Sequence, residues 1–367
     1  MITSAYIHIP FCNNICSYCD FSKIYYDKKF VERYLKELEK DILSTYNNEE
    51  LKTIYIGGGT PSSLSLDELK VLFKILSKLN KSKSYEYTIE CNFDSITKEK
   101  LDLFKEVGIN RISFGLESIN KDNLSFLERS LAITKVKEII KYCESINLTN
   151  INLDLMYALP NETLDVLEKD IDFILDLNVP HISTYSLIIE DHTKLGINKT
   201  KPISEELDNK MYKLICSKLK DYNHYEISNF AKDGYESKHN LVYWHNEEYY
   251  GFGLGAAGYI DNVRYTKTKS ITKYLDSDYI NSKNIEYLST KDKIEYEVLL
   301  NLRLKEGIDL LRFKDKYNRE LKEYYKYQKL IDRELLTLKD NHLFIPEDLW
   351  YISNRIIVEL LMEVIWW

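Results

Sequence analysis

The chain has 367 residues, of which 44% are hydrophobic, so it can build one large α/β domain and a smaller appended domain. Its 50 basic and 58 acidic residues give a formal net charge of −8, which argues against a nucleic-acid binder, because such proteins usually present a basic surface. The first ten residues lack a secretory signal, no apolar run is long enough to span a bilayer, and six cysteines without a signal suggest a reducing cytoplasm.

The first half of the chain alternates apolar strand patterns with amphipathic helix patterns. The predicted strands are residues 5–9, 53–56, 85–90, 111–114, 151–155 and 181–187. The predicted helices are residues 28–46, 66–79, 97–107, 133–146 and 164–177, with Ser65 as an N-cap and Gly108 as a helix stop. Six such units predict a parallel sheet curved into a partial (β/α)6 barrel, in which ligands bind at the carboxyl ends of the strands.

The second half of the chain has a different pattern. A loop over residues 191–204 and a helix over 205–219 are followed by residues 225–260, which are rich in Gly, Asn, His and aromatic residues. Residues 266–289 are predicted to be a linker. Helices are expected at 291–302, 310–317 and 321–335, then a hairpin turn at Asp340-Asn341 and a helix from about Leu349. Residues 290–367 are therefore expected to form a mainly helical, winged-helix-like domain.

Three cysteines near the start, Cys12, Cys16 and Cys19, have the spacing C-x3-C-x2-C. Thiolates this close in a short loop can converge on one inorganic centre, and an iron–sulfur cube with three local thiolates would leave one iron open to another ligand. A Cys3His zinc site using His8 and a redox pair of Cys16 and Cys19 are the alternatives. Cys91, Cys143 and Cys216 are scattered and are expected to be small buried hydrophobes.

Polar groups follow several of the predicted strands. The segment Gly-Gly-Gly-Thr-Pro at 57–61 has more glycines than a turn requires. It would let a ligand approach the backbone closely, with backbone amide and carbonyl groups exposed to that ligand. Glu90, Glu117 and Asp154 lie at the ends of, or within, successive apolar strands, where a charge is costly unless it is paired or bound. Each carboxylate could be purely structural, but three in equivalent positions favour a polar ligand with amine and hydroxyl groups, and Arg129 is a candidate counter-charge.

The segment His-Asn-Leu-Val-Tyr-Trp, residues 239–244, has two readings. It can be a loop that packs two aromatic side chains, or His239 can contact or ligate a flat aromatic macrocycle, since His is a common haem ligand.

Residues 6–21 resemble the cluster loop of the radical S-adenosylmethionine (SAM) superfamily. The chain is most similar to the branch that contains oxygen-independent coproporphyrinogen III oxidase and the haem chaperone HemW. The resemblance extends to residues 57–61, 111–117, 152–160, 181–190, 225–230, 239–244 and 301–308. It implies a radical SAM core and extension over residues 1–265. Phe21 stands where the oxidase usually has a further Cys, the oxidase's N-terminal extension is lacking, and the 239–244 segment is similar to a haem-chaperone signature.

The resemblance implies three cofactors: a [4Fe-4S] cluster on Cys12, Cys16 and Cys19, SAM on the open iron, and haem. It places Tyr6 and Tyr18 beside the cluster and SAM. It assigns the methionine moiety of SAM to Gly58, Gly59 and Thr60. The rest of the SAM pocket would be lined by Glu90, Glu117, Arg129 and Asp154, with Ser186 as a weaker candidate and His239 as the haem contact.

The chain also departs from the family pattern. The family more often has Gln at position 117, Cys91 and Phe93 replace Ala and Pro, and Ala257-Gly258 replaces a frequent His-Ser pair. A His that the family has shortly after the position of Arg129 is absent. These departures predict a SAM pocket that is present but altered in detail.

Three functions are compatible with the resemblance. The first hypothesis is a cytoplasmic haem chaperone that delivers haem to target haemoproteins. The second is a true radical enzyme, in which a 5′-deoxyadenosyl radical oxidises a porphyrinogen propionate, and a relative of haem-degrading methyltransferases is the weaker third. The partners implied are haem or porphyrin, haem-accepting proteins, an electron donor such as flavodoxin or ferredoxin, no nucleic acid, and at most a peripheral membrane contact.

Overall fold

The computed structural model describes residues 1–277 and 284–365. The chain divides into two compact units. Unit 1 consists of Met1–Leu219 and Glu248–Glu286, and unit 2 consists of Lys220–Glu247 and Tyr287–Trp367. The boundaries expected from the sequence, 1–265, 266–289 and 290–367, differ from this division, because residues 220–247 group with the C-terminal part of the chain. Residues 278–283 of the expected linker lie outside the described residues.

The central sheet of unit 1 is parallel, and its strands run in the order β11-β1-β4-β5-β6-β7-β8. The strands of this sheet are β1 (Ser4–Ile9), β4 (Leu51–Gly58), β5 (Lys81–Asn92), β6 (Arg111–Glu117), β7 (Ile151–Tyr157), β8 (His181–Ser186) and β11 (Tyr250–Phe252). All six predicted strands are confirmed, although the observed strands begin or end up to four residues from the expected positions. The predicted partial barrel of parallel strands is therefore correct.

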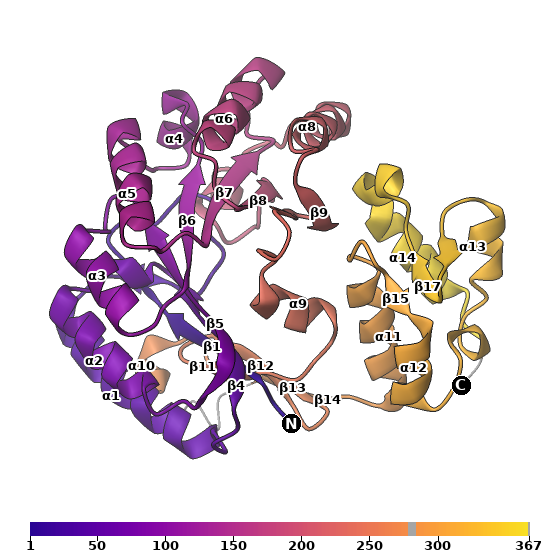
Figure 1. Ribbon diagram of the computed structural model, residues 1–367, viewed down its shortest axis with the longest axis horizontal. Helices are drawn as coiled ribbons and strands as arrows, with labels where there is room; N and C mark the ends of the chain where they lie inside the picture. The colour runs from indigo at the N-terminus through magenta and orange to yellow at the C-terminus, as the bar shows by residue number, and fades with distance from the viewer. Residues whose placement is uncertain (278–283, 366–367) are drawn as a thin grey trace. The chain divides into compact units, whose positions relative to one another are not determined.

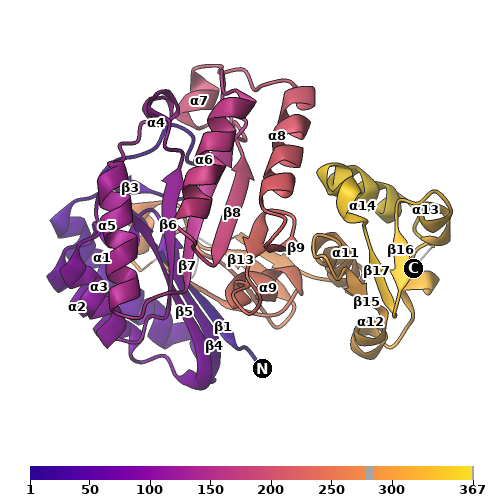
Figure 2. The same ribbon diagram turned by 45° about the horizontal axis from the view of Figure 1, so that its top comes forward.

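Helices cover one side of this sheet, and Figures 1 and 2 show α1, α2, α3, α5 and α6 along its outer side. The helices of unit 1 are α1 (Lys28–Thr45), α2 (Leu66–Leu76), α3 (Lys98–Glu106), α4 (Lys121–Phe126), α5 (Ile133–Ser145), α6 (Leu164–Asp176), α7 (Lys194–Ile197), α8 (Glu205–Lys218) and α10 (Ile271–Leu275). Ser65 caps α2 in a capping box with Glu68, as expected, and Gly108 follows α3 with a φ of +87°. The short helix α7 lies within residues 191–204, which were expected to be a loop, and α4 lies where no element was predicted.

Alternation along the strands separates an apolar outer face from a polar inner face. Ile112 and Phe114 are fully buried on one face of β6, while Arg111 and Ser113 point to the other. On that inner face Asn152 Nδ2 donates to Ser113 Oγ (2.7 Å) and to Asp154 Oδ1 (2.8 Å). A closed eight-stranded barrel is filled by branched apolar side chains, so a polar interior indicates a surface that contacts a polar ligand.

The short strands of unit 1 lie at its edges. Strand β2 (Phe11–Cys12) pairs with β3 (Ile24–Tyr25) and brackets the loop that carries the cysteines. A second sheet consists of β12 (Ala257–Ile260), β13 (Val263–Thr266) and β14 (Asn284–Tyr287). Asp41 on α1 is fully buried and connects that helix to residues 253–274. It accepts hydrogen bonds from Gly253 N (2.9 Å) and Tyr274 OH (3.0 Å), and it pairs with Lys267.

Unit 2 combines helices with short antiparallel strands. Its elements are β9 (Asn223–Glu226), β10 (Asn229–Ala231), α9 (Lys238–Trp244), α11 (Thr290–Asn301), β15 (Ile308–Asp309), α12 (Leu310–Tyr317), α13 (Gln328–Asp332), β16 (Thr337–Lys339), β17 (His342–Phe344) and α14 (Ser353–Met362), with the 3-10 turns η2 (Leu321–Glu323) and η3 (Glu347–Ile352). The three-stranded sheet β15-β17-β16 and its helices form the expected winged-helix-like arrangement. The predicted hairpin turn is confirmed: Asp340 and Asn341 both have positive φ (50° and 62°) between β16 and β17.

The continuous helix predicted for residues 321–335 is wrong. The chain forms only η2 and α13 there, because the backbone of residues 324–326 pairs with the end of the chain instead. Tyr325 bridges Val364, and Lys326 N donates to Glu363 O (3.0 Å). A long-range backbone pairing thus interrupts an amphipathic pattern that would otherwise continue as a helix.

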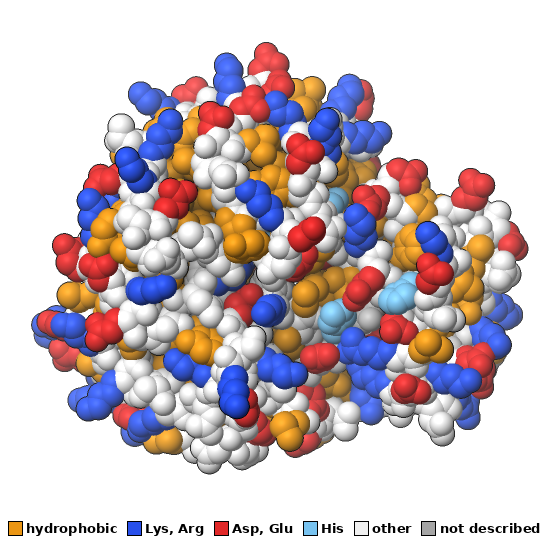
Figure 3. Space-filling model, in the orientation of Figure 1, with side chains coloured by type: hydrophobic (Ala, Val, Ile, Leu, Met, Phe, Trp, Pro, Cys, Tyr) orange, Lys and Arg blue, Asp and Glu red, His pale blue; other side chains and the backbone are white. Residues whose placement is uncertain are grey.

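Charged side chains of both signs are interspersed over the face of the molecule shown in Figure 3. Many form surface ion pairs, such as Lys218 with Glu168 (3.1 Å), which contribute little to stability. Within the described residues, none of the helices combines the length and the apolar character needed to cross a bilayer.

Candidate functional site

The three cysteines lie in one loop at the carboxyl end of β1, and none of them forms a disulfide. Cys12 is buried in β2, whereas Cys16 and Cys19 are partly exposed. Burial raises the pKa of the Cys12 thiol to about 11 and also raises the pKa values of Cys16 and Cys19. The thiols are therefore protonated in the metal-free protein, and binding of a metal centre would have to displace their protons.

Two side chains already donate hydrogen bonds to the sulfur atoms. Thr60 Oγ1 donates to Cys12 Sγ at 3.6 Å, and Arg129 Nη1 donates to Cys16 Sγ at 3.7 Å. Donors placed against sulfur stabilise the thiolate form that an iron–sulfur cluster requires. The described residues show no group of three or more His, Cys, Asp or Glu side chains gathered tightly enough for a single metal ion.

His8 is not positioned to be a zinc ligand. It is buried in β1, its Nδ1 accepts from Tyr6 OH (3.0 Å), and its Nε2 donates to Ser22 O (2.6 Å). Burial lowers the pKa of His8 to about 4, so the ring is neutral. With both ring nitrogens bonded within the protein, the Cys3His alternative lacks its fourth ligand.

The glycine-rich segment after β4 packs directly against the cysteine loop. Gly59 N donates to Ile9 O and Thr60 N donates to Phe11 O, both at 2.9 Å, while Gly58 N donates to Glu90 Oε2 at 3.0 Å. These amide groups are therefore already used, contrary to the expectation that they would be exposed to a ligand. The carbonyl oxygens of the segment are its remaining polar backbone groups, and a carbonyl oxygen can accept a hydrogen bond from a ligand ammonium group.

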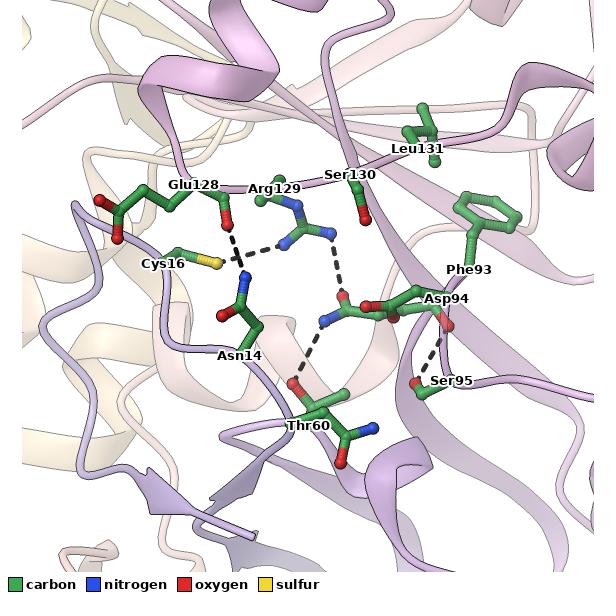
Figure 4. Close-up of a pocket in the computed structure, with 12 residues that line it drawn as sticks. Asn14, Cys16, Thr60, Phe93, Asp94, Ser95, Glu128, Arg129, Ser130 and Leu131 are labelled. Atoms are coloured by element: carbon green, nitrogen blue, oxygen red, sulfur yellow. Dashed lines mark hydrogen bonds between the residues drawn. The ribbon is translucent and has the colours of Figure 1, made fainter.

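Arg129 connects the remaining polar residues of this edge, and Figure 4 shows its hydrogen bond to Cys16. Its Nη2 donates to Asn92 Oδ1 (3.0 Å) and to Gly115 O (2.9 Å), and its Nη1 lies 3.2 Å from Glu117 Oε1. Arg129 and Glu117 are 12% and 9% exposed, so the pair is shielded from solvent. Burial raises the pKa of the Glu117 carboxyl, and the neighbouring Arg129 opposes that shift. Both terminal nitrogens of Arg129 thus have partners within the protein, so a ligand carboxylate that binds this cation would have to compete with Glu117 for it.

Backbone geometry brings Glu117 to Arg129. Glu117 has a φ of +65°, which is uncommon for a residue with a side chain, and the pairing of β6 with β7 shifts register between Gly115 and Glu117. A Cβ atom on Gly115 would lie 2.9 Å from Glu117 Oε1 and 3.0 Å from Arg129 Nη2. Only glycine at position 115 therefore lets the two charged side chains close over the strand.

The other two carboxylates face the interior of the barrel. Glu90 accepts from Tyr55 OH (2.8 Å) as well as from Gly58 N, and burial raises the pKa of Glu90 to about 7. Asp154 accepts from Asn152, and burial raises its pKa as well. Both groups can accept hydrogen bonds from hydroxyl or amine groups of a ligand.

The remaining predicted residues are distributed around this site. Tyr6 stacks on Tyr55, with ring centroids 6.1 Å apart. Tyr18 lies beside Cys16 and Glu117 and packs against the apolar cluster that includes Leu127. Ser186 ends β8, and its hydroxyl donates to Asp208 at 3.3 Å. The structure therefore places the predicted site residues of unit 1 on the inner face of its sheet or at the carboxyl edge.

Asn92 was not predicted, although it bridges two site residues. Its Oδ1 accepts from Arg129, and its Nδ2 donates to Thr60 Oγ1 at 3.2 Å. Cys16, Thr60, Asn92 and Arg129 all line one pocket. Asn92 lies two residues after Glu90 in the same strand, so strand alternation alone places it on the same face and could have identified it.

His239 belongs to unit 2, where it lies in α9. Its side chain is 1% exposed, and its Nε2 and the Tyr243 hydroxyl are 2.7 Å apart.

Comparison with known proteins agrees with this geometry. The radical SAM superfamily model matches residues 6–174, and the HemN C-terminal domain model matches residues 288–348. Heme chaperone HemW of Lactococcus lactis subsp. lactis is 36% identical to the chain, over 98% of the chain and 97% of the relative. Heme chaperone HemW of Bacillus subtilis is 41% identical, over 87% of the chain and 88% of the relative. The chain belongs to the heme chaperone HemW family.

The fold of this HemW family member is also that of a solved structure. Coproporphyrinogen III oxidase HemN of Escherichia coli, described as a radical SAM enzyme, superposes with a TM-score of 0.84 over 97% of the chain and 89% of HemN. The two sequences are 19% identical, so this likeness shows the fold alone.

The residues present fit the cofactors of the radical SAM superfamily, a [4Fe-4S] cluster and SAM. Three free thiols share one loop, and two of them already accept hydrogen bonds from neighbouring side chains. The adjoining edge offers a buried cation, backbone carbonyls and carboxylates, which match the carboxylate, ammonium and hydroxyl groups of SAM. When bound, the two cofactors supply one-electron chemistry, and the protein's residues hold and orient them.

Proposed function

We propose that this protein binds haem and delivers it to haem-accepting proteins. The observation that carries the proposal is the similarity to proteins named heme chaperone HemW, which extends over 98% of the chain in one relative. The similarity includes both the cysteine loop and the C-terminal part of the chain, so it covers both compact units.

In this proposal, Cys12, Cys16 and Cys19 hold the cluster. Gly58, Gly59 and Thr60 meet the methionine part of SAM, and Arg129 receives its carboxylate. The other residues proposed for the pocket are Tyr6, Tyr18, Glu90, Glu117, Asp154 and Ser186. The support for these roles is that Arg129 lies beside both Cys16 and Glu117, so a cation and hydrogen-bonding groups are already grouped next to the cysteine loop.

His239 is proposed as the haem contact. Because its side chain is 1% exposed, the residues around α9 would have to move before the imidazole could meet iron. We therefore expect haem binding to be accompanied by a local rearrangement of unit 2.

The cellular context is proposed from the same family relationship. We expect a cytoplasmic protein that receives electrons from a flavodoxin or ferredoxin and makes at most a peripheral contact with a membrane. The haem acceptors are expected to be apoproteins that bind the transferred haem more tightly than this protein does, since net transfer must lower the free energy.

The competing function is that of an oxygen-independent coproporphyrinogen III oxidase. The likeness to HemN concerns the fold, and Phe21 occupies the position where the oxidase is expected to have another cysteine. Phe21 is 68% exposed, and it cannot act as a further thiolate ligand.

The test is anaerobic reconstitution with iron and sulfide, followed by incubation with SAM and either haem or coproporphyrinogen III. We expect stable haem binding, transfer of that haem to an apo-haemoprotein such as apomyoglobin, and no protoporphyrinogen. Formation of protoporphyrinogen would instead establish the oxidase, and failure to bind haem would reject the chaperone proposal.

A further inference from the structure

The segment proposed to contact haem forms a helix of only seven residues. Ser237 caps α9 by accepting a hydrogen bond from Asn240 N (3.4 Å). A helix this short is unstable by itself. The amide groups of residues 245–247 bond the carbonyl groups of Leu241, Val242 and Tyr243, but the carbonyl groups of Trp244 and of the two residues after it need partners from elsewhere. The position of His239 therefore depends on what holds the far end of α9.

Three side chains from the C-terminal part of the chain supply those partners. Asn301 Nδ2 donates to Trp244 O (3.0 Å), Arg312 Nη2 donates to His245 O (3.2 Å), and Lys316 Nζ donates to Asn246 O (3.3 Å). The three acceptors are consecutive backbone carbonyls at the end of α9. The donors come from α11 and α12, more than fifty residues further along the chain.

Glu297 accepts hydrogen bonds from residues on both sides of these contacts. It is 2% exposed, and its Oε2 accepts from Asn246 Nδ2 (3.0 Å), Lys316 Nζ (2.6 Å) and Tyr317 OH (3.1 Å). A buried carboxylate with three donors is rigidly held, and removal of one donor leaves its charge less well compensated. Glu297 thus couples the turn after α9 to both α11 and α12.

We propose that Glu297, Asn301 and Lys316 are positioning residues for the haem-contacting segment, so that α11 and α12 set the geometry of the haem site without touching haem. This inference rests on the proposed function, because it requires that α9 contacts haem. All the contacts involved lie within unit 2.

Lys316 and Lys314 on α12 offer a matched pair of variants. Lys316 contacts Asn246 O and Glu297, whereas the exposed Lys314 pairs with Glu320 (3.0 Å). Lys316→Met removes the donor and keeps most of the side-chain volume, Lys314→Met makes the same chemical change away from α9, and Lys316→Arg restores a charged donor. His239→Ala reports the loss of the haem contact itself.

The measurements are the Soret maximum, the ligand-field spectrum and the Kd for haemin of the reconstituted full-length protein. We expect Lys316→Met to shift the Soret band and weaken haemin binding about five-fold, roughly the net contribution of one ordinary hydrogen bond. Lys314→Met should match the wild type, and Lys316→Arg should restore the spectrum. Thermal unfolding checks that each variant is folded, and Asn301→Ala replaces Lys316→Met if that variant fails to fold.

The outcomes separate the two proposals. If the wild type does not bind haemin, the proposed function itself is rejected. If the wild type binds haemin and His239→Ala shifts the Soret band, but folded Lys316→Met and Asn301→Ala have wild-type spectra and affinities, the positioning role is rejected and the function stands. An unchanged His239→Ala spectrum removes the haem contact from α9 and overturns the inference in the same way.

Discussion

A Cβ atom on Gly59 would lie 2.9 Å from Cys12 Sγ and 2.8 Å from Pro10 O. The backbone after β4 therefore touches the cysteine loop, and a residue without a side chain is required at the contact. This contact brings Thr60, the next residue, within 3.6 Å of Cys12 Sγ. The glycine-rich segment thus shapes the proposed cluster site as well as the proposed SAM pocket.

The first prediction concerns Gly59→Ala. The added methyl group must push the cysteine loop away from β4, so we expect the variant to retain less iron and acid-labile sulfide after anaerobic reconstitution. Gly234→Ala is the control, since a Cβ atom there meets nothing within 4 Å and bears only the strain of a φ of +82°. Wild-type iron content in Gly59→Ala would show that the close approach is not needed.

The second prediction concerns the cluster ligands. Cys16→Ser should abolish the broad visible absorbance of the reconstituted cluster, because a serine hydroxyl replaces one of only three local thiolates. Cys216→Ser, on α8, changes a cysteine outside the loop and should leave the spectrum intact. An unaltered spectrum in Cys16→Ser would refute the assignment of Cys16 as a ligand.

The third prediction concerns the buried pair of Asp41 and Lys267. Their side chains are 0% and 5% exposed, so Lys267→Met leaves a buried carboxylate without its cation. We expect the free energy of unfolding to fall by about 3–5 kcal/mol, as measured by urea denaturation. Lys269→Met, two residues away on the surface, should change stability by less than about 0.5 kcal/mol.

A second variant tests the reason for that loss. Replacing the carboxylate as well, in Asp41→Asn/Lys267→Met, should recover part of the lost stability, because no uncompensated buried charge remains. If the double variant is as unstable as the sum of the two single variants, the loss comes from packing rather than from charge.

The fourth prediction concerns pH and His224. Its ring stacks on Phe230 (centroids 3.9 Å apart) and packs edge-on against Trp350 (4.4 Å), and burial lowers its pKa to about 4. Glu347 and Lys305 are the charged groups that act on it, with opposite signs. The unfolded chain, with a pKa near 6.5, binds a proton first as the pH falls. The contribution of the neutral His224 ring to stability is therefore complete above about pH 6.5 and is lost progressively towards pH 4.

The measurement is the free energy of unfolding in urea at pH 7 and pH 4.5, followed by tryptophan fluorescence. We expect the wild type to lose about 2–3 kcal/mol more than His224→Phe over this interval, because the phenyl ring fills the stack but cannot take up a proton. Other groups, such as the buried Glu226 with a pKa raised to about 7, change stability in the opposite direction in both proteins, so the comparison removes them. Equal slopes for the two proteins would contradict the prediction.

Much of unit 1 could be predicted from local patterns, because each parallel strand is an apolar run followed by an amphipathic helix. Strand β11 could not be predicted. It has three residues, and its position depends on pairing with β1, where Ala5 lies opposite Tyr250. Nothing in the local sequence around Tyr250 indicates a partner about 245 residues earlier in the chain.

The candidate site also has features that the local sequence predicts and features that depend on long-range contacts. Residue types indicated the cysteine loop and the carboxylates, since thiols and buried charges have few structural uses. The connections between them depend on tertiary geometry. The contact of Arg129 with Cys16 joins residues 113 positions apart, and it requires the left-handed backbone of Glu117 and the open face left by Gly115.

The order of segments along the chain has a practical consequence for dissecting the protein. Unit 2 is assembled from two stretches, Lys220–Glu247 and Tyr287–Trp367, with part of unit 1 between them. A truncation before α11 would not leave unit 1 alone, because α9 would remain attached to it. That helix would have lost its hydrogen bonds with Asn301, Arg312 and Lys316. Limited proteolysis that cuts ahead of Thr290 should therefore release fragments that stay associated until they are denatured. Because segments of the two units alternate along the chain, no single cut separates one unit from the other.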